Sequence, residues 1–384
     1  MRYQLLAALA LASAAARSAV AQPTAERPYS LYVSSEGGDR VTHLRVDSAG
    51  WRVVREIPVG LNPADLAGPH NVSVAPDGKH WYVSIAHGTP MGSVWKFATA
   101  TDSLVGRAEV GMFPTTIGLS PDGDWAYVPN SDFHGDRGGI NTVSVIYTPE
   151  MRTIANLPTC DMPHGSRWNR AGTVVYIACM MSDEVVAFDA GTMRIAARAS
   201  LGSGHPMSMA EHMRMEAQTD SAPPRPAPGA ASSTMPGQNP DCLTTYVSVS
   251  RDDARIFLAC NHSSELQVRD ARTLALLARA PTGTGAYNVE PSPDGRLVLV
   301  TNKKAQSVSV LDAVTLKELA RVATSKRIPH GIAYSPDGRY AFVTCESVGT
   351  DPGAVDAIDL GTLTRVASLP LPLQPTGVAV WTER

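Results

Sequence analysis

A four-residue turn that recurs along the chain constrains the fold more than any other feature. Its pattern is Ser/Ala-Pro-Asp-Gly, and a run of β-branched and aromatic residues follows each copy. Four copies are complete and two are degenerate; they begin at Ala75, Ser120, Ser292, Ser335, Asn169 and Ser250. The chain is therefore built from repeats of one small structural unit, which overrides the expectation of several domains from length alone.

The spacing of the turns identifies the unit. Asp77 and Asp122 are 45 residues apart, and Asp294 and Asp337 are 43 residues apart. Each interval has room for a strand before the turn, a strand after it, an alternating strand such as 307–311 and one further strand. Four short strands at this period are typical of one blade of a β-propeller.

A seventh unit is divided between the two ends of the chain. Residues 31–34 match the second strand of a unit, and residues 41–59 supply the third and fourth. The missing first strand lies at 375–380, so the two ends complete one blade and close the ring without open sheet edges. We predict an all-β fold, a single seven-bladed β-propeller of four-stranded blades over residues 22–384. Two β-sandwiches would not explain why the ends complement each other.

The N-terminus has the pattern of a secretory signal peptide. Arg2 precedes an apolar run at 5–16, and Ala19-Val20-Ala21 is a typical cleavage site, so residues 1–21 are expected to be removed. The run is too short to cross a bilayer, and we expect no membrane span. Removing Arg2 and Arg17 changes the net charge from −3 to −5, which gives no electrostatic reason to expect a nucleic-acid partner. We predict a periplasmic or secreted monomer.

The second strands carry a family motif. The clearest copies are Leu-Val-Thr-Asn at 299–302, Tyr-Val-Pro-Asn at 127–130 and Phe-Val-Thr-Cys at 342–345. In these strands the chain resembles the YVTN β-propeller repeat proteins, over roughly residues 28–382. The resemblance implies a propeller that is often exported, and it implies no particular reaction, because one propeller scaffold hosts unrelated activities.

Three histidines occupy one repeat position. His70, His164 and His330 each lie five residues before the first residue of a turn, at the start of the innermost strand of a blade. The starts of the innermost strands, the ends of the second strands and the connections between blades share one face of the disc, which we call the upper face. Eight of the ten histidines map to this face.

Two interpretations of the three histidines stay open. Each imidazole could hydrogen-bond a neighbouring loop, as any repeated residue can. Alternatively, the three could hold a metal ion at the channel mouth, since neutral imidazole is a common ligand of copper and zinc. The Pro-His-Gly motifs at His164 and His330 are similar to those that hold copper in the propeller of nitrous-oxide reductases. The chain has no adjacent His-His pair and no C-terminal cupredoxin module, so we do not expect that activity.

The five cysteines divide into two pairs and one remainder. Cys179, Cys260 and Cys345 end second strands, and reflection about the turns places residues near 162 and 243 opposite the first two. We predict the disulfides Cys160–Cys179 and Cys242–Cys260, which an oxidising compartment allows. Cys345 is left unpaired near His330, either as a small buried apolar residue or as a soft copper ligand.

A long insertion, predicted to be a flexible loop, occupies residues 203–241 between the fourth and fifth blades. Four methionines and two histidines lie within eleven residues at its start, and the candidate ligands among them are His205, Met207, Met209, His212 and Met213. Thioethers with imidazoles suit Cu(I), whereas a short amphipathic helix with methionines packed on the upper face would need no metal. Both interpretations stay open.

The sequence therefore predicts an exported binding protein with a copper site at the upper face, made of His70, His164 and His330, with Cys345 and the segment 205–215 as secondary ligands. One alternative is an enzyme that uses the same face, either a lactonase or other hydrolase or an oxidoreductase. The other is a protein-interaction scaffold. The partner in either case would be a protein or small molecule at the upper face.

Overall fold

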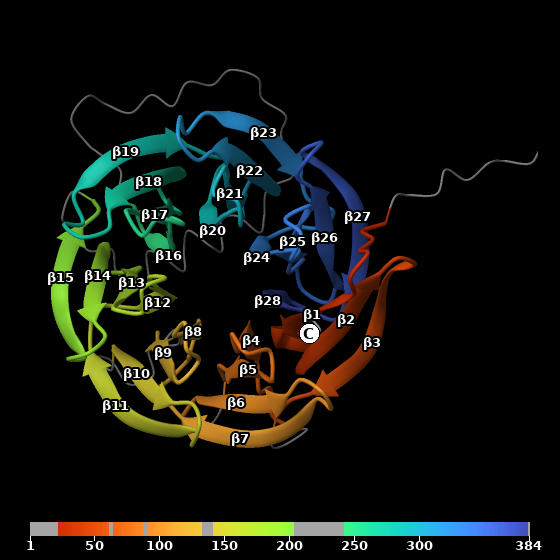
Figure 1. Cartoon of the computed structure of the whole chain (residues 1–384), viewed down its shortest axis with the longest axis horizontal. Coiled ribbons are helices and arrows are strands. Elements are labelled where there is room, and N and C mark those ends of the chain that lie inside the picture. The colour runs from red at the N-terminus through yellow and green to blue at the C-terminus, as the bar shows by residue number, and fades with distance from the viewer. Residues whose placement is uncertain (1–21, 61–63, 88–90, 133–140, 203–241, 383–384) are drawn as a thin grey trace, which may run out of the picture.

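The computed structural model describes residues 22–60, 64–87, 91–132, 141–202 and 242–382. Seven sheets stand around a central axis in these residues, and the chain passes once around the ring from one sheet to the next (Figure 1). The described helical structure is a single 3₁₀ turn, η1 (Glu36–Gly38). The prediction of an all-β, seven-bladed propeller is confirmed. The predicted signal peptide and the 203–241 insertion lie outside the described residues.

Each blade is a four-stranded antiparallel sheet whose strands follow one another from the channel outwards. Blade 1 contains β28 (Pro375–Thr382), β1 (Tyr29–Ser35), β2 (Arg40–Asp47) and β3 (Gly50–Pro58). Blade 2 contains β4 (Pro69–Val74), β5 (His80–Ile85), β6 (Ser93–Ala98) and β7 (Ser103–Glu109). Blade 3 contains β8 (Gly118–Leu119), β9 (Trp125–Asn130), β10 (Thr142–Tyr147) and β11 (Arg152–Pro158). Blade 4 contains β12 (Pro163–Trp168), β13 (Val174–Cys179), β14 (Glu184–Asp189) and β15 (Arg194–Ser200).

The remaining three blades follow the same order. Blade 5 contains β16 (Thr244–Val249), β17 (Arg255–Cys260), β18 (Glu265–Asp270) and β19 (Leu276–Pro281). Blade 6 contains β20 (Ala286–Pro291), β21 (Leu297–Asn302), β22 (Ser307–Asp312) and β23 (Glu318–Ala323). Blade 7 contains β24 (Pro329–Tyr334), β25 (Tyr340–Cys345), β26 (Gly353–Asp359) and β27 (Thr364–Leu371).

The two ends of the chain close the ring as predicted. β28 pairs antiparallel with β1, with Tyr29 opposite Thr382 and Val33 opposite Val378. β28 is thereby the innermost strand of the blade that β1, β2 and β3 complete. Because the first and last strands of the chain pair with each other, blade 1 is complete and packs between blades 7 and 2 like any other blade.

The recurring turn has a local explanation. In the copy at 292–295, the Ser292 hydroxyl donates to the Asp294 carboxylate at 2.6 Å, and Asp294 in turn accepts the backbone N–H of Arg296 at 3.1 Å. Gly295 has a φ of +74°, a backbone conformation that L side chains rarely adopt. The serine, the aspartate and the glycine therefore each serve the reversal between the first and second strands of a blade.

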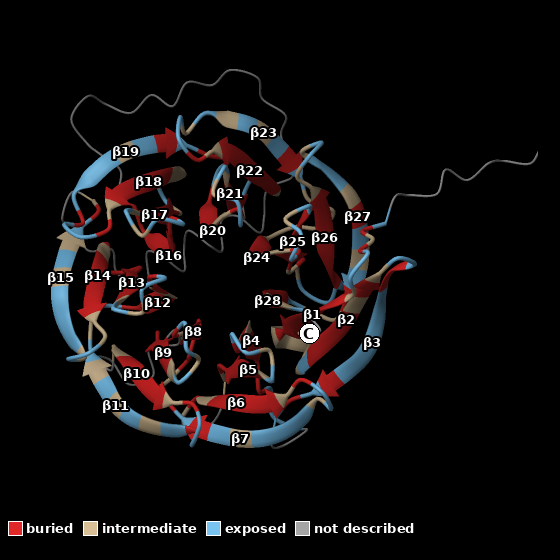
Figure 2. Cartoon of the chain, in the orientation of Figure 1, coloured by how far each residue is buried: buried red, intermediate tan, exposed pale blue. Residues whose placement is uncertain are grey.

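The core lies between neighbouring blades. The second and third strands are buried, because a blade packs against each of their faces, whereas the outermost strands are largely exposed to solvent (Figure 2). Between blades 1 and 2, Tyr32 stacks on Trp81 with ring centroids 4.9 Å apart, and Trp81 stacks on Phe97 at 4.0 Å. Such aromatic pairs fill the wedge between twisted sheets.

Both predicted disulfides are confirmed. Cys160–Cys179 and Cys242–Cys260 span 19 and 18 residues of sequence and have normal S–S bonds. Each ties the approach to an innermost strand to the end of the second strand, at the upper face of blades 4 and 5. Within the described part of the chain, no helix has the length and apolar character that crossing a membrane requires.

Candidate functional site

Seven residues at one repeat position surround the upper end of the channel, one from each blade. We call this set the mouth ring, and it consists of His70, Thr115, His164, Thr245, Tyr287, His330 and Thr376. Four members are large and three are threonines. The threonine hydroxyls bond backbone carbonyls, whereas the large rings pack against one another.

The three histidines predicted from the sequence come together. His70 contacts both others, with ring centroids 5.9 Å from His164 and 5.4 Å from His330, each nearly perpendicular. Their exposed fractions are 6%, 3% and 1%. Tyr287 lies 4.5 Å from His330 and 5.7 Å from His164, ring to ring. Imidazoles that are far apart in sequence thus form one buried aromatic cluster.

The threonines of the mouth ring hold the neighbouring blade. Thr115 donates to the carbonyl of His164 at 2.7 Å, Thr376 donates to the carbonyl of His70 at 2.5 Å, and Thr245 donates to the carbonyl of Tyr287. In each case the acceptor is the mouth-ring residue of the next blade. The backbone that carries these large side chains is therefore fixed from the side.

The Pro-His-Gly motif also has a packing reason. A Cβ atom on Gly165 would lie 2.8 Å from the Cα of Tyr246, and one on Gly331 would lie 2.5 Å from the carbonyl oxygen of Thr376. The glycine after each of these histidines lets adjacent innermost strands approach closely.

A second tier of residues, most of them polar, lies beside the mouth ring. Each of its members directly follows the second strand of a blade: Glu36, Met180, Asn261, Lys303 and Glu346. Together with the histidines they line a pocket of about 370 Å³, which we call the upper pocket. This tier is not apparent from the sequence, because its residue types differ from blade to blade. Its shared position, one residue past the family motif, was the signal available.

Glu36 binds two histidines at once. Its Oε2 lies 2.6 Å from Nδ1 of His70 and its Oε1 lies 2.9 Å from Nε2 of His87. Burial alone would raise the pKa of Glu36, but these contacts, His70 above all, hold it well below its usual range. An ionised carboxylate only accepts hydrogen bonds, so Nδ1 of His70 carries a proton, and in the neutral form of the ring Nε2 would bear the lone pair.

His164 is oriented in the same sense by the backbone. Its Nδ1 lies 2.9 Å from the carbonyl oxygen of Thr245, which can only accept, so Nδ1 is the donor. Nε2 then bears the lone pair and accepts from the Tyr287 hydroxyl at 3.2 Å. Both His70 and His164 are therefore held with Nδ1 as the donor, so that in the neutral ring Nε2 is the nitrogen that could bind a metal; in His164 the Tyr287 hydroxyl now occupies it.

His330 is held as a neutral ring. Burial, and then the positive charge of Lys303, lower the pKa of His330 well below its usual value. Lys303 pairs with Glu346 at 3.0 Å and lies 3.6 Å from the centre of the Tyr287 ring. Nε2 of His330 is 3.9 Å from Glu346, and burial raises the pKa of that carboxyl although Lys303 opposes the shift.

The residue types of the cluster suit a metal ion, but the present distances between their side chains are too long for them to share one. Nε2 of His70 and Nε2 of His330 are buried without a hydrogen-bond partner. An unpaired buried polar atom is costly, and a ligand that supplies the missing partner explains it. As the side chains stand, no three His, Cys, Asp or Glu residues in the described ranges converge to metal-ligand distances.

Cys345 lies away from the upper pocket. Its side chain is fully buried in the apolar cluster between blades 6 and 7, beside Leu299 and Ile332. The sulfur lies 3.7 Å from Oδ2 of Asp356, and burial raises the pKa of the thiol well above its usual value. This placement favours the interpretation of a small buried residue over that of a metal ligand. The candidate ligands at 205–213 lie outside the described residues.

One further cluster has the hydrogen-bond order of a nucleophilic triad. Ser30 lies 2.8 Å from Nε2 of His43, and Nδ1 of His43 lies 2.9 Å from Asp102. Ser30 is 1% exposed, and Tyr32 and Trp81 also donate to Asp102. Because a nucleophile must reach its substrate, this buried network is structural and locks blade 1 to blade 2.

No family model matches the chain, and no curated protein matches it. The YVTN resemblance therefore stays a prediction. Many solved structures share the fold. One is hydrazine synthase of Kuenenia stuttgartiensis, with a TM-score of 0.62 and 18% identity over 83% of this chain and 93% of that one. A functionally unknown protein from Desulfotomaculum acetoxidans has a TM-score of 0.68 and 12% identity over 92% and 99%. The dihydro-heme d1 dehydrogenase NirN has a TM-score of 0.56 and 16% identity over 91% and 74%. At these identities the likeness establishes a β-propeller and leaves the function to the site.

Proposed function

We propose that this chain is an exported propeller that binds a copper ion at the channel mouth through His70, His164 and His330. The observation that carries the proposal is that the buried ring of His70 contacts the buried rings of both His164 and His330, all three from equivalent positions of three blades. The two confirmed disulfides are compatible with a periplasmic or extracellular protein.

The spacing of the rings supports a shared ion. Two imidazoles on one metal have ring centroids about 5 Å apart, because metal–nitrogen bonds are about 2 Å long. The observed 5.4 Å and 5.9 Å are close to this value. The proposal requires the rings to rotate until their Nε2 atoms point at one ion, because the present side-chain positions do not converge on one.

The surroundings of the rings also support the proposal. Metal-binding histidines commonly donate their other ring N–H to a carboxylate or a backbone carbonyl. Glu36 has this role for His70, and the Thr245 carbonyl has it for His164. Neutral imidazoles select late first-row ions, with copper bound more tightly than zinc. We extend the proposal to His205, Met207, Met209, His212 and Met213 as accessory Cu(I) ligands, from their composition alone.

Metal analysis of the exported full chain tests the proposal. After loading with copper or zinc and removal of excess ion, we expect one tightly bound copper per chain. X-ray absorption of the bound copper should show imidazole nitrogens. His330→Ala and His70→Gln should each release the ion, whereas His80→Ala, on the turn side of blade 2, should not. A metal-free wild type, or equal loading of the folded His330 and His70 variants, would overturn the proposal.

A further inference from the structure

The channel below the mouth ring holds a second cavity, of about 610 Å³. It extends from the residues just after the mouth ring to the Pro-Asp-Gly turns, where Pro76 and Pro121 line it. We call it the lower channel. Among the described residues, none lines both this cavity and the upper pocket. Tyr246, which packs against His164 and His330, lies in the layer between the two.

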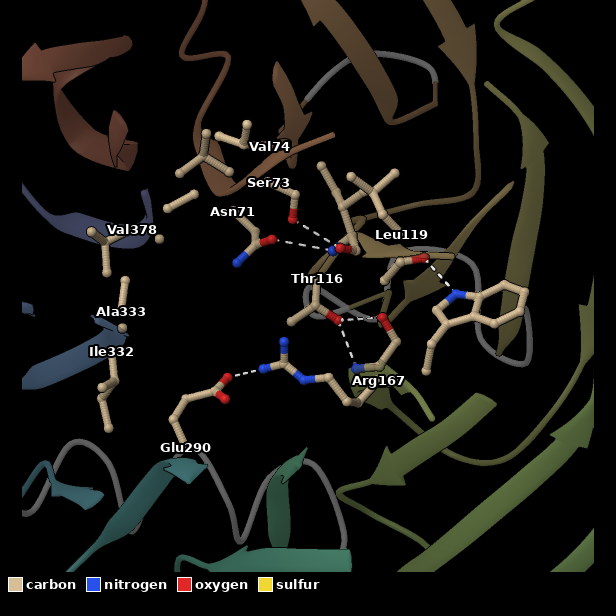
Figure 3. A pocket seen from close by; sticks show the side chains of 18 of the residues that line it. Asn71, Ser73, Val74, Thr116, Leu119, Arg167, Glu290, Ile332, Ala333 and Val378 are labelled. Carbon is tan, nitrogen blue, oxygen red and sulfur yellow. Dashed lines mark hydrogen bonds and ion pairs between the residues drawn. The ribbon is translucent and has the colours of Figure 1, made fainter. Parts of the chain in front are cut away.

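An ion pair spans the lower channel. Arg167 on β12 reaches past blade 5 to Glu290 on β20 (Figure 3). Ser248, from the blade between them, donates to the Glu290 carboxylate at 2.9 Å. The pair is thus fixed in place, and Figure 3 shows the second terminal nitrogen of Arg167 pointing into the open centre of the channel.

Polar atoms around this pair are left without partners. Nε of Arg167 and Oδ1 of Asn288 are buried and make no hydrogen bond, and Asn288 as a whole is 4% exposed. Asn71 accepts the backbone N–H of Ile117 at 3.1 Å through its oxygen, and Figure 3 shows its nitrogen directed away from that bond. Asn71, Arg167 and Asn288 all line this one cavity, and a few polar groups in a largely apolar cavity are typical of binding sites for small polar molecules.

The opposite wall is apolar. Ile332, Ala333 and Val378 border the cavity from blades 7 and 1 (Figure 3). A ligand that fits both walls has a short hydrocarbon part and at least two polar groups.

The charged residues that line the cavity favour a negatively charged ligand. Arg167 and the exposed Arg170 at the lower mouth outnumber Glu290, the acidic side chain that lines the lower channel. Guanidinium groups bind carboxylates through two parallel hydrogen bonds. We propose that the lower channel binds a small hydroxycarboxylate, with its carboxylate on Arg167 and its hydroxyl group on Asn71 and Asn288.

Calorimetric titration of the metal-free exported chain with lactate tests the inference. Propionate lacks the hydroxyl group and lactamide lacks the charge, so we expect each to bind about tenfold or more weakly than lactate. The double variant Arg167→Gln/Glu290→Gln keeps a neutral amide pair across the channel and should lose lactate binding. Arg152→Gln, which removes a positive charge from the exposed β11, is the matched control and should bind lactate normally.

The inference is independent of the copper site. No lactate binding by wild type, equal binding by the double variant, or equal binding of lactamide would overturn it. The double variant should still load copper, so failure of the channel ligand and failure of the metal site are distinguishable.

Discussion

Asp102 joins the first two blades through its hydrogen bonds. It lies on the turn between β6 and β7, and it accepts hydrogen bonds from His43, Tyr32 and Trp81 of blades 1 and 2. Burial alone would raise the pKa of Asp102, but these donors, His43 first, outweigh it and lower the pKa below the ordinary 3.8. The charged form is therefore stabilised in the folded protein.

The shift predicts how stability depends on pH. A carboxyl whose pKa is lower in the folded than in the unfolded protein stabilises the fold above the unfolded value of about 3.8, and this contribution is lost as the pH falls through the folded value. Asp102→Asn should lower the free energy of unfolding at pH 7 by about 1–3 kcal/mol. Urea titrations between pH 7 and pH 2 should show the difference from wild type shrinking below pH 4.

The exposed Asp351→Asn is the control and should change stability little at any pH. A constant difference between wild type and Asp102→Asn across this range would contradict the assignment of the effect to the carboxylate charge.

At the scale of elements, the innermost strands are placed by glycines. Gly331 on β24 faces the Thr376 carbonyl of β28, where a Cβ atom would lie 2.5 Å from the oxygen. The Pro-His-Gly motif drew attention to this position in the sequence, but it was interpreted as part of a metal site and not as a requirement for close packing. The close approach became visible only when the neighbouring strand was in place, since 45 residues separate Gly331 from Thr376.

Gly331→Ala should therefore push β24 away from β28 and destabilise the protein by about 1–3 kcal/mol, the usual cost of overpacking. Gly191→Ala is the matched control, because its Cβ would meet nothing closer than 3.6 Å. Thermal unfolding followed by circular dichroism checks the pair of variants. Equal melting temperatures for Gly331→Ala and wild type would show that the strands can separate without cost.

At the scale of the whole molecule, the sequence repeat predicted the closed ring of blades and the location of the candidate site at the upper face. His70, His164 and His330 could be placed because they share a spacing from the turn. The partners of these histidines could not, because Glu36 and Lys303 share a position but no residue type. The Arg167–Glu290 pair crosses the channel between residues 123 apart with no motif at either end. Such contacts depend on the width of the channel, which cannot be derived from the sequence.

The last prediction concerns how the ring of blades is closed. β28 pairs with β1 and closes the ring, so removing residues 375–384 leaves the inner edge of β1 with unpaired backbone groups. We expect the truncated chain to lose cooperative thermal unfolding and to aggregate. A synthetic peptide of residues 375–384 should restore both cooperative unfolding and solubility by adding the missing strand.

The same peptide with Gly377→Val provides the control for specific insertion. A Cβ atom at this position would lie 2.8 Å from the Cα of Asn71 on β4, so the altered peptide cannot seat beside blade 2 and should not restore folding. Circular dichroism melting and size-exclusion chromatography of the truncated chain, alone and with each peptide, measure the outcome. If the truncated chain melts cooperatively alone, or if both peptides rescue it equally, closure by β28 is not what holds the ring together.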